Sequence, residues 1–115
     1  MAAVRQRKVE SLLKEEISGL VSKGTIKDPR LAPMTTITGV EVSRDLRYAK
    51  VYVSLYGDRT VRSQSVETLN HASGFIHRQL KQTLRLRYIP RLTFYADESI
   101  ERGVRITNKI KEILS

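Results

Sequence analysis

The stretch from residue 69 to residue 96 constrains the fold more than any other part of the sequence. It predicts a helix, a break, a second helix, a proline stop and a strand in direct succession. The break falls at Ala72-Ser73-Gly74, and the stop at Pro90. A chain that alternates helices and strands in this way is expected to be an α+β domain in which helices cover a sheet.

The second helix of this stretch is expected to run to about Tyr88 and to be amphipathic. Successive side chains on a helix are about 100° apart. Three apolar residues therefore share one face: Ile76, Leu80 and Leu84. Three cations fall together on the opposite face: Arg78, Lys81 and Arg85. One face can be buried while the other points at solvent or phosphate.

Positive charge is concentrated in the same region. No acidic residue occurs between Glu67 and Asp97. The interval carries both histidines and five cations: His71, His77, Arg78, Lys81, Arg85, Arg87 and Arg91. A nucleic-acid backbone site needs fixed charge and a place of close approach, and a basic helix beside a small-residue break offers both. A solvated helix face is the alternative. The lack of a nearby acid favours binding.

Composition narrows the class of partner. The 115 residues indicate one domain, and 21 basic against 12 acidic residues give a net charge of +9. This balance favours a polyanion: RNA, DNA or an anionic membrane. The sequence contains no cysteine, which excludes disulfides and thiolate metal sites and fits a reducing compartment. We expect a cytoplasmic protein that does not span a membrane.

Catalytic and metal-binding patterns are not found. Neither histidine has a carboxylate or a second histidine at metal-ligand spacing. Asp97, Glu98 and Glu101 are better interpreted as a helix start than as an acid–base pair. There is no phosphate loop and no nucleophile elbow. We therefore expect neither an enzyme nor a cofactor, metal or small-molecule substrate.

An N-terminal helix is predicted over residues 4–22. Its apolar positions recur at three- and four-residue spacing: Val9, Leu12, Leu13, Ile17 and Leu20. Gly24 favours an end there because glycine accepts the left-handed conformation. Arg5, Arg7 and Lys8, called here the N-terminal cluster, lie where the helix dipole is positive and attracts phosphate. An equally supported interpretation is that these three cations only keep this end of the helix soluble.

Two strands are predicted next, at 34–43 and 48–56, as an antiparallel hairpin. A bulge at Gly39 would bring Ile37, Val40 and Val42 to one face. Alternation in the second strand leaves a polar and aromatic set on the outer side: Tyr48, Lys50, Tyr52, Ser54 and Tyr56. That face could touch RNA, but a solvated face stabilised by cross-strand aromatic pairs is the favoured interpretation.

The remaining elements complete the order helix, strand, strand, helix, helix, strand. Ser63 or Ser65 is expected to cap the helix after the hairpin. Leu92, Phe94 and Ala96 are expected to form the buried face of the third strand. The predicted architecture is an α+β layer with three helices on one face of a three-stranded sheet.

The domain is expected to occupy residues 1–97, with 98–115 as a C-terminal segment expected to be helical. Three isoleucines in that segment recur at helical spacing: Ile106, Ile110 and Ile113. This stripe leaves open an alternative function, a protein-interaction module with a basic solvated surface and an apolar C-terminal helix for a partner.

The element order resembles a type II KH domain, although the usual Gly-x-x-Gly loop is replaced by Ala72-Ser73-Gly74. Several stretches carry a closer resemblance: Arg5 to Ile17, Asp28-Pro29-Arg30, Ile37 to Ser43, Ala49 to Ser54, Ala72 to Ile76, Leu84 to Arg87, and Pro90 to Leu92. In their joint order these stretches resemble the ribosome-binding factor A family over nearly the whole chain.

The resemblance implies a bacterial, non-catalytic assembly factor. Such a factor binds the small ribosomal subunit and its RNA, supports late maturation near the precursor 5′ end and helps growth in the cold. It implies that Ala72, Ser73 and Gly74 form the kink, that Gly74 lets the backbone bend, and that Ser73 reaches phosphate. The cations implied to contact ribosomal RNA are those of the second helix: Arg78, Lys81 and Arg85. We add Arg87 and the N-terminal cluster to the predicted RNA-binding residues, and expect a monomer.

Overall fold

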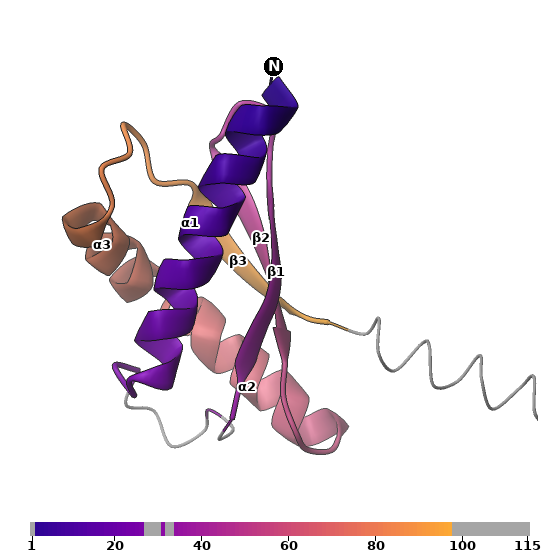
Figure 1. Ribbon diagram of the computed structural model, residues 1–115. Helices are drawn as coiled ribbons and strands as arrows, with labels where there is room; N and C mark the ends of the chain where they lie inside the picture. The colour runs from indigo at the N-terminus through magenta and orange to yellow at the C-terminus, as the bar shows by residue number, and fades with distance from the viewer. Residues whose placement is uncertain (1, 27–30, 32–33, 98–115) are drawn as a thin grey trace, which may run out of the picture.

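The computed structural model describes residues 2–26, 31 and 34–97, and these form three helices and three strands (Figure 1). The elements are α1 (Ala2–Ser22), β1 (Thr36–Val42), β2 (Tyr48–Ser54), α2 (Arg59–His71), α3 (Ser73–Thr83) and β3 (Arg91–Ala96). The predicted order is confirmed. The loop predicted at 25–33 lies only partly within these residues, and the C-terminal segment 98–115 lies outside them.

The sheet has the strand order β1-β2-β3 and is mixed. β1 and β2 form the predicted antiparallel hairpin, whereas β3 lies parallel to β2. The register of the hairpin shifts between Ile37 and Gly39, so the predicted bulge is present. It brings Ile37, Val40 and Val42 to the buried face together. The parallel pairing requires a crossover, which α2 and α3 provide.

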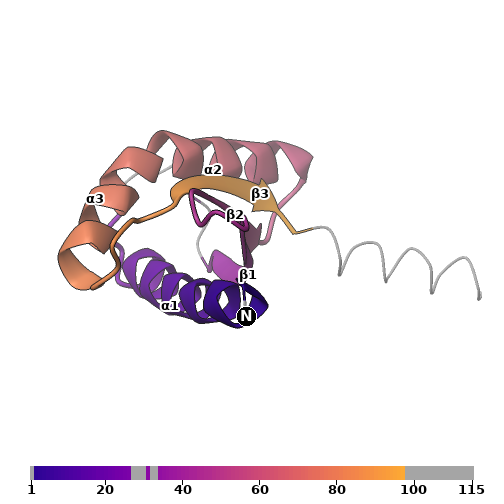
Figure 2. The same cartoon turned by 90° about the horizontal axis from the view of Figure 1, so that it is seen from above.

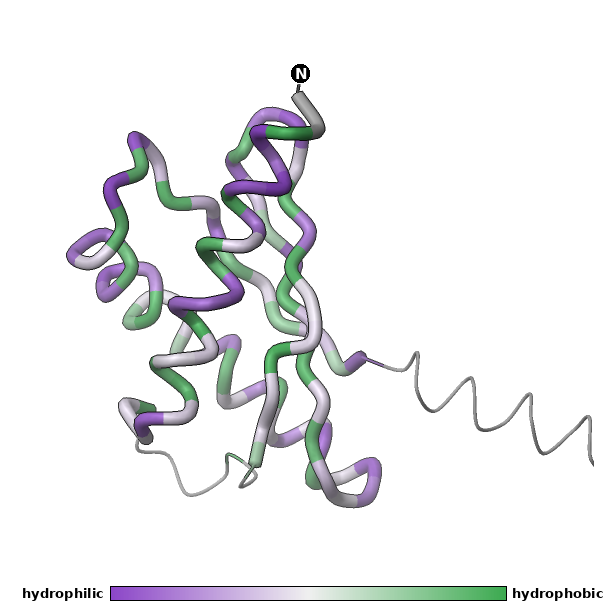
Figure 3. The backbone as a smooth tube through the Cα atoms, in the orientation of Figure 1, coloured by the Kyte–Doolittle hydropathy of each residue, from purple (hydrophilic) through white to green (hydrophobic). Residues whose placement is uncertain are grey.

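The three helices lie on one side of the sheet, and the opposite side faces away from all of them (Figure 2). The core between them is formed by residues exposed by 1% or less: Leu13 and Ile17 of α1, Val51 and Val53 of β2, Leu69 of α2, Ile76 and Leu80 of α3, and Phe94 of β3. Hydrophobic and hydrophilic residues alternate along the elements accordingly (Figure 3). Leu12, expected in the buried stripe of α1, is 41% exposed because it faces outward.

Two glycines fix the ends of helices. Gly24 has φ +69°, and the amides of Gly24 and Thr25 donate to the carbonyls of Val21 and Leu20. This is a Schellman arrangement that ends α1 as predicted. Gly57 has φ +143°, and a Cβ there would lie 2.5 Å from Val61 Cγ1. Only glycine fits this turn into α2.

The cap of α2 is Asp58, not Ser63 or Ser65 as predicted. The Asp58 carboxylate accepts from the Val61 amide at 2.9 Å. The helix therefore begins several residues earlier, and Ser65 is fully buried within it. An aspartate directly after a glycine turn is an ordinary capping signal. The competing serines obscured it in the sequence.

Each outer strand is bonded to a helix side chain at one position. The Gln6 side chain donates to the Val42 carbonyl at 2.9 Å, and the Glu10 carboxylate accepts from the Val42 amide at 3.0 Å. On the other edge, the Asn70 amide oxygen accepts from the Phe94 amide at 2.7 Å, and its NH₂ donates to the Phe94 carbonyl at 3.1 Å. These pairs fix α1 against β1 and α2 against β3.

Candidate nucleic-acid interface

The break between α2 and α3 is made by Ala72 alone. This residue ends one helix and begins the next, with φ −83° and ψ −1°. Its amide donates to the Thr68 carbonyl at 3.0 Å, and its carbonyl accepts from the Ile76 amide at 2.9 Å. Such a backbone conformation is open to any residue. The expectation that Gly74 lets the backbone bend is therefore wrong.

Gly74 instead lies exposed in the first turn of α3, where it leaves room beside an arginine. A Cβ built at Gly74 would be 3.8 Å from Nη1 of Arg78. The arginine side chain thus folds back toward the start of its own helix. Ala72 provides no side-chain cap, and the first turn holds no acidic residue. Free amides of the helix start and a guanidinium group therefore lie together, an arrangement suited to an anion.

Ser73 is half-buried, and so is Ala72. The serine is thus less open than the resemblance implied, although it begins α3 beside the exposed Gly74. Of the three residues expected to form the kink, Gly74 is the one for which the structure shows a neighbouring Arg78 side chain. Close approach of a phosphate would be to the backbone of Gly74, since it has no side chain to shield it.

The predicted cations are all exposed, but they are not all on one helix. Arg78 and Lys81 belong to α3, which ends at Thr83 and not near Tyr88 as predicted. Leu84 has extended backbone, φ −103° and ψ 136°, so the expected placement of Arg85 on the helix face is wrong. Arg85 and Arg87 lie in the loop 84–90 instead. We call Arg78, Lys81, Arg85 and Arg87 the α3 patch.

Burial explains why the helix stops early. Leu84, Leu86 and Ile89 are partly buried against the core. The extended backbone at Leu84 begins a segment that carries these residues across the domain toward β3, whereas a helix would have pointed some of them into solvent. The apolar contacts therefore override the local helix preference of the sequence.

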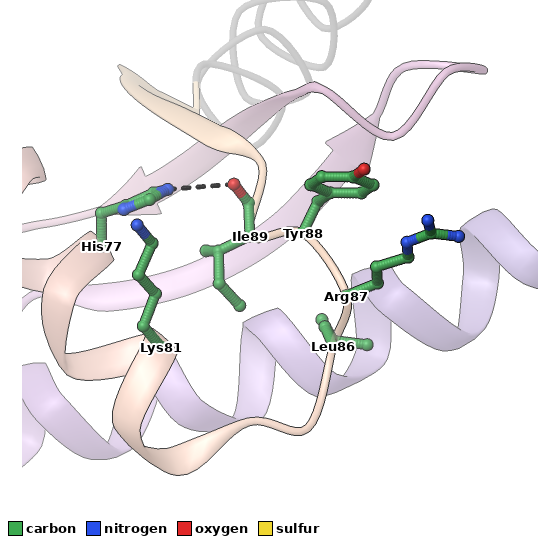
Figure 4. A pocket seen from close by; sticks show the side chains of 6 residues that line it. All are labelled: His77, Lys81, Leu86, Arg87, Tyr88 and Ile89. Carbon is green, nitrogen blue, oxygen red and sulfur yellow. Dashed lines mark hydrogen bonds between the residues drawn. The ribbon is translucent and has the colours of Figure 1, made fainter.

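One hydrogen bond closes the loop 84–90 onto α3. The Ile89 carbonyl lies 2.9 Å from Nε2 of His77. A carbonyl only accepts, so the imidazole donates through Nε2–H. Between the loop and α3 is a pocket of about 420 Å³ lined by His77, Lys81, Leu86, Arg87, Tyr88 and Ile89. In Figure 4 the amine of Lys81 lies beside His77, while Arg87 points away from it.

His77 and Tyr88 are pocket residues that were not assigned to the site from the sequence. The guanidinium carbon of Arg87 lies 5.6 Å from the centroid of the Tyr88 ring, a cation–π contact. The tyrosine is 70% exposed. His77 precedes Lys81 by four residues, which was the one available signal that they share a face. The hydrogen bond to Ile89 joins α3 to the loop twelve residues further along the chain. No spacing in the sequence could have predicted it.

The N-terminal cluster is carried by a different helix. Arg5, Arg7 and Lys8 are all exposed on the first turns of α1. The start of α1 and the loop 84–90 lie in the same half of the molecule (Figure 1). Two inward residues of the same turns, Gln6 and Glu10, bond to Val42. The cluster therefore has a fixed position, set by the edge of the sheet.

Two other kinds of site are not found in the part of the chain that the structure describes. Those residues contain no group of three or more histidine, cysteine or acidic side chains that could hold a metal ion. Of the helices α1 to α3, none is long and apolar enough to cross a lipid bilayer. The cationic surfaces are the main polar features that remain.

Helices on one face of a mixed three-stranded sheet, with a helix–break–helix unit between the parallel strands, define a KH-like α+β domain. A model of the ribosome-binding factor A family matches residues 5–110. The chain is 42% identical over 109 residues to ribosome-binding factor A from Dictyoglomus thermophilum, covering 95% of this chain and 90% of that protein. The chain belongs to the ribosome-binding factor A family.

Solved structures agree with this assignment. The crystal structure of ribosome-binding factor A from Thermus thermophilus matches with a TM-score of 0.68 and 25% identity, covering 79% of this chain and 94% of that one. A homology model of the Thermus thermophilus protein, fitted into a cryo-EM map of its complex with the 30S subunit, matches with a TM-score of 0.66 and 25% identity. That match covers 79% of this chain and 93% of that one.

Proposed function

We propose that this protein is a non-catalytic assembly factor that binds the small ribosomal subunit and its RNA and supports late maturation of that RNA. It acts in the cytoplasm as a monomer, and it supports growth in the cold. Membership of the ribosome-binding factor A family supports the subunit as target, because a family member has been fitted into a map of its 30S complex.

The observation that carries the RNA contact is the α3 patch. Its four cations are exposed on one helix and the loop that follows it, and the sequence from Thr68 to Ala96 contains no acid to neutralise them. Arg78 is held near the start of α3, where the helix dipole also favours a phosphate. The patch therefore offers several positive groups at defined positions to a phosphate backbone.

The arrangement suits holding RNA and not changing it chemically. Phosphate contacts position a protein on nucleic acid, whereas folded RNA is recognised mainly by its shape. A patch whose charges have defined positions binds best to one arrangement of the RNA backbone. The factor would stabilise that arrangement of the RNA in the immature subunit. The size of the effect equals the difference between the factor's binding free energy for that arrangement and for the alternative arrangements.

Binding of the full chain to isolated small subunits across a salt series tests the proposal. Each phosphate contact contributes about −0.7 to −0.9 to the slope of log affinity against log salt. Four contacts from the α3 patch predict a slope of log affinity against log salt of about −3. A folded protein that fails to bind subunits at low salt would overturn the proposal.

Maturation is tested separately in cells. Depletion of the protein is expected to leave precursor small-subunit RNA with unprocessed ends, most strongly in the cold. The wild-type chain should restore processing. Normal processing in depleted cells at all temperatures would show that binding serves some other purpose.

A further inference from the structure

The side of the sheet that faces away from the helices carries a row of aromatic and basic side chains. Its members on the two neighbouring strands are Tyr48, Lys50 and Tyr52 of β2 and Arg91, Thr93 and Tyr95 of β3. The parallel register places Tyr48 beside Arg91 and Tyr52 beside Tyr95. The sequence indicated the β2 half of this face, but only the pairing of β3 adds Tyr95 and Arg91 to it.

The rings of this face are open to solvent. Tyr48 is 59% exposed and Tyr95 is 41% exposed. The rings of Tyr52 and Tyr95 are 6.0 Å apart and inclined by 34°. Tyr48 and Tyr52 are separated along β2 by about 13 Å, the rise of four strand residues. An extended single strand of nucleic acid can span this distance and present its unpaired bases to the rings.

Charge on the face is unevenly distributed. Arg91 and Arg47 lie at the Tyr48 end, where the Arg91 amide donates to the Arg47 carbonyl at 2.8 Å. Acids lie near both ends of the face. At the Tyr48 end, the Asp45 carboxylate of the hairpin turn accepts from the Arg47 amide at 3.1 Å. Two further acids, Glu41 and Asp97, accept hydrogen bonds from side chains of β2 and β1. The Glu41 carboxylate accepts from the Tyr52 hydroxyl at 3.3 Å, and Asp97 accepts from Thr38 at 2.6 Å. The Tyr48 end therefore combines an open ring with the side chain of Arg91, which belongs to the same face.

We propose that this open sheet face is a second RNA contact, at which unpaired nucleotides stack on Tyr48 and Tyr95 while Lys50 and Arg91 bind their phosphates. The inference rests on the proposed function, because these nucleotides belong to the RNA that the α3 patch holds. Stacking on aromatic rings beside cations is how proteins bind single strands. The strand residues that line this face include no aliphatic side chain, so an apolar helix of a protein partner finds little to bury there.

Fluorescence anisotropy of a labelled, unstructured ten-nucleotide RNA with the full-length chain tests this. Each base–aromatic stack contributes about tenfold in affinity, so Tyr48→Leu with Tyr95→Leu, which removes two stacks, should weaken binding by about a hundredfold. Tyr48→Phe with Tyr95→Phe keeps both rings and should restore the affinity. Tyr56→Leu is the matched control, since Tyr56 is exposed but lies beyond the end of β2. Because the chain has no tryptophan, RNA should also quench its tyrosine fluorescence.

Several outcomes would overturn the inference. If the double leucine variant binds the RNA as tightly as wild type, the strand binds elsewhere. If that variant does not fold, Lys50→Gln with Arg91→Gln replaces it, and an unchanged affinity and salt slope would be equally decisive. If the wild-type protein associates with itself and the double leucine variant does not, the sheet face binds a second copy of the chain and not RNA. Tight binding to small subunits without any binding to the oligonucleotide would refute this inference alone, whereas no binding to subunits would refute the proposed function.

Discussion

Two helical regions pack on the same side of the sheet, α1 on one hand and α2 with α3 on the other, and they position their cations in different ways. In α1, Arg5, Arg7 and Lys8 lie on regular helix, and Gln6 and Glu10 of the same turns bond to the edge of β1. In the second region, α2 is bonded to β3 through Asn70, while half of the α3 patch lies in a loop. The first region places its charges through secondary structure, whereas the second depends on buried leucines and one histidine bond.

The difference shows that charge density and rigidity are separate properties. The N-terminal cluster is rigid but shares its helix with Glu10, Glu15 and Glu16. The α3 patch is free of acids but needs its loop held in place. If the RNA contact depends on charge, the α3 patch dominates. If it depends on rigid presentation alone, the N-terminal cluster contributes at least as much as the α3 patch.

Charge reversal should separate these possibilities with the largest effect. Arg78→Glu, Lys81→Glu and Arg85→Glu together should lower affinity for small subunits by on the order of a hundredfold, because three attractive contacts become repulsive. The same reversal of the N-terminal cluster should cost about tenfold or less. Affinity is measured by co-sedimentation with subunits. The control reverses three exposed cations that belong to neither the N-terminal cluster nor the α3 patch, namely Lys14, Lys23 and Arg59. Equal losses in the two regions would refute the dominance of the α3 patch.

Loss of the anchor in the second region should reduce stability most. Asn70→Ala removes two hydrogen bonds from the backbone of Phe94, and should lower the free energy of unfolding by about 2–3 kcal/mol. Gln6→Ala removes one bond from α1 and should cost about 1 kcal/mol. Urea unfolding followed by circular dichroism measures both. A larger cost for Gln6→Ala would reverse the assignment of the critical anchor.

The loop that carries Arg85 and Arg87 should depend on His77. His77→Ala leaves the Ile89 carbonyl without its donor, and should weaken subunit binding several-fold while costing about 1 kcal/mol of stability. His71→Ala is the matched control, because that histidine is exposed and its contact is a 3.8 Å pairing with Glu67. Unchanged binding by the His77 variant would mean that the leucines alone fix the loop.

The smallest effect is expected at Gly74. Gly74 has an ordinary helical position, and an added Cβ would make only an ordinary contact with Arg78 Nη1 at 3.8 Å. Gly74→Ala should therefore raise the free energy of unfolding by up to about 0.5 kcal/mol. The added methyl group should nevertheless weaken subunit binding a few-fold by shielding the backbone of the helix start. Thermal unfolding and subunit binding measured on one preparation check both directions. A variant that binds normally would remove Gly74 from the interface.

Local pattern predicted what depends on local physics. The order of elements, the hairpin, the bulge beside Gly39 and the end of α1 at Gly24 follow from spacing and glycine chemistry. The end of α3 did not, because Leu84 continues the helical spacing of Ile76 and Leu80, and together with Leu86 it also fits an extended pattern. Contact with the distant core decides between the two.

The charged residues of the candidate site could be predicted from the sequence, but the hydrogen bonds that position them could not. The residues of the α3 patch were evident from an interval without acids. The bond of His77 to Ile89 and the bonds of Asn70 to Phe94 join elements only after the chain has folded. These pairs have no recurring spacing in the sequence, because each forms only once β3 has its register in the sheet.

The parallel pairing of β2 with β3 also sets a time at which the interface can exist. The chain is synthesised from its N-terminus, and α2 and α3 leave the ribosome before β3 does. Until Phe94 is available, Asn70 has no partner, and until Ile89 is available, the loop after α3 cannot close. A nascent chain therefore carries the charges of the α3 patch before it carries their geometry. Release of the last strand from the exit tunnel is the step that makes a finished factor.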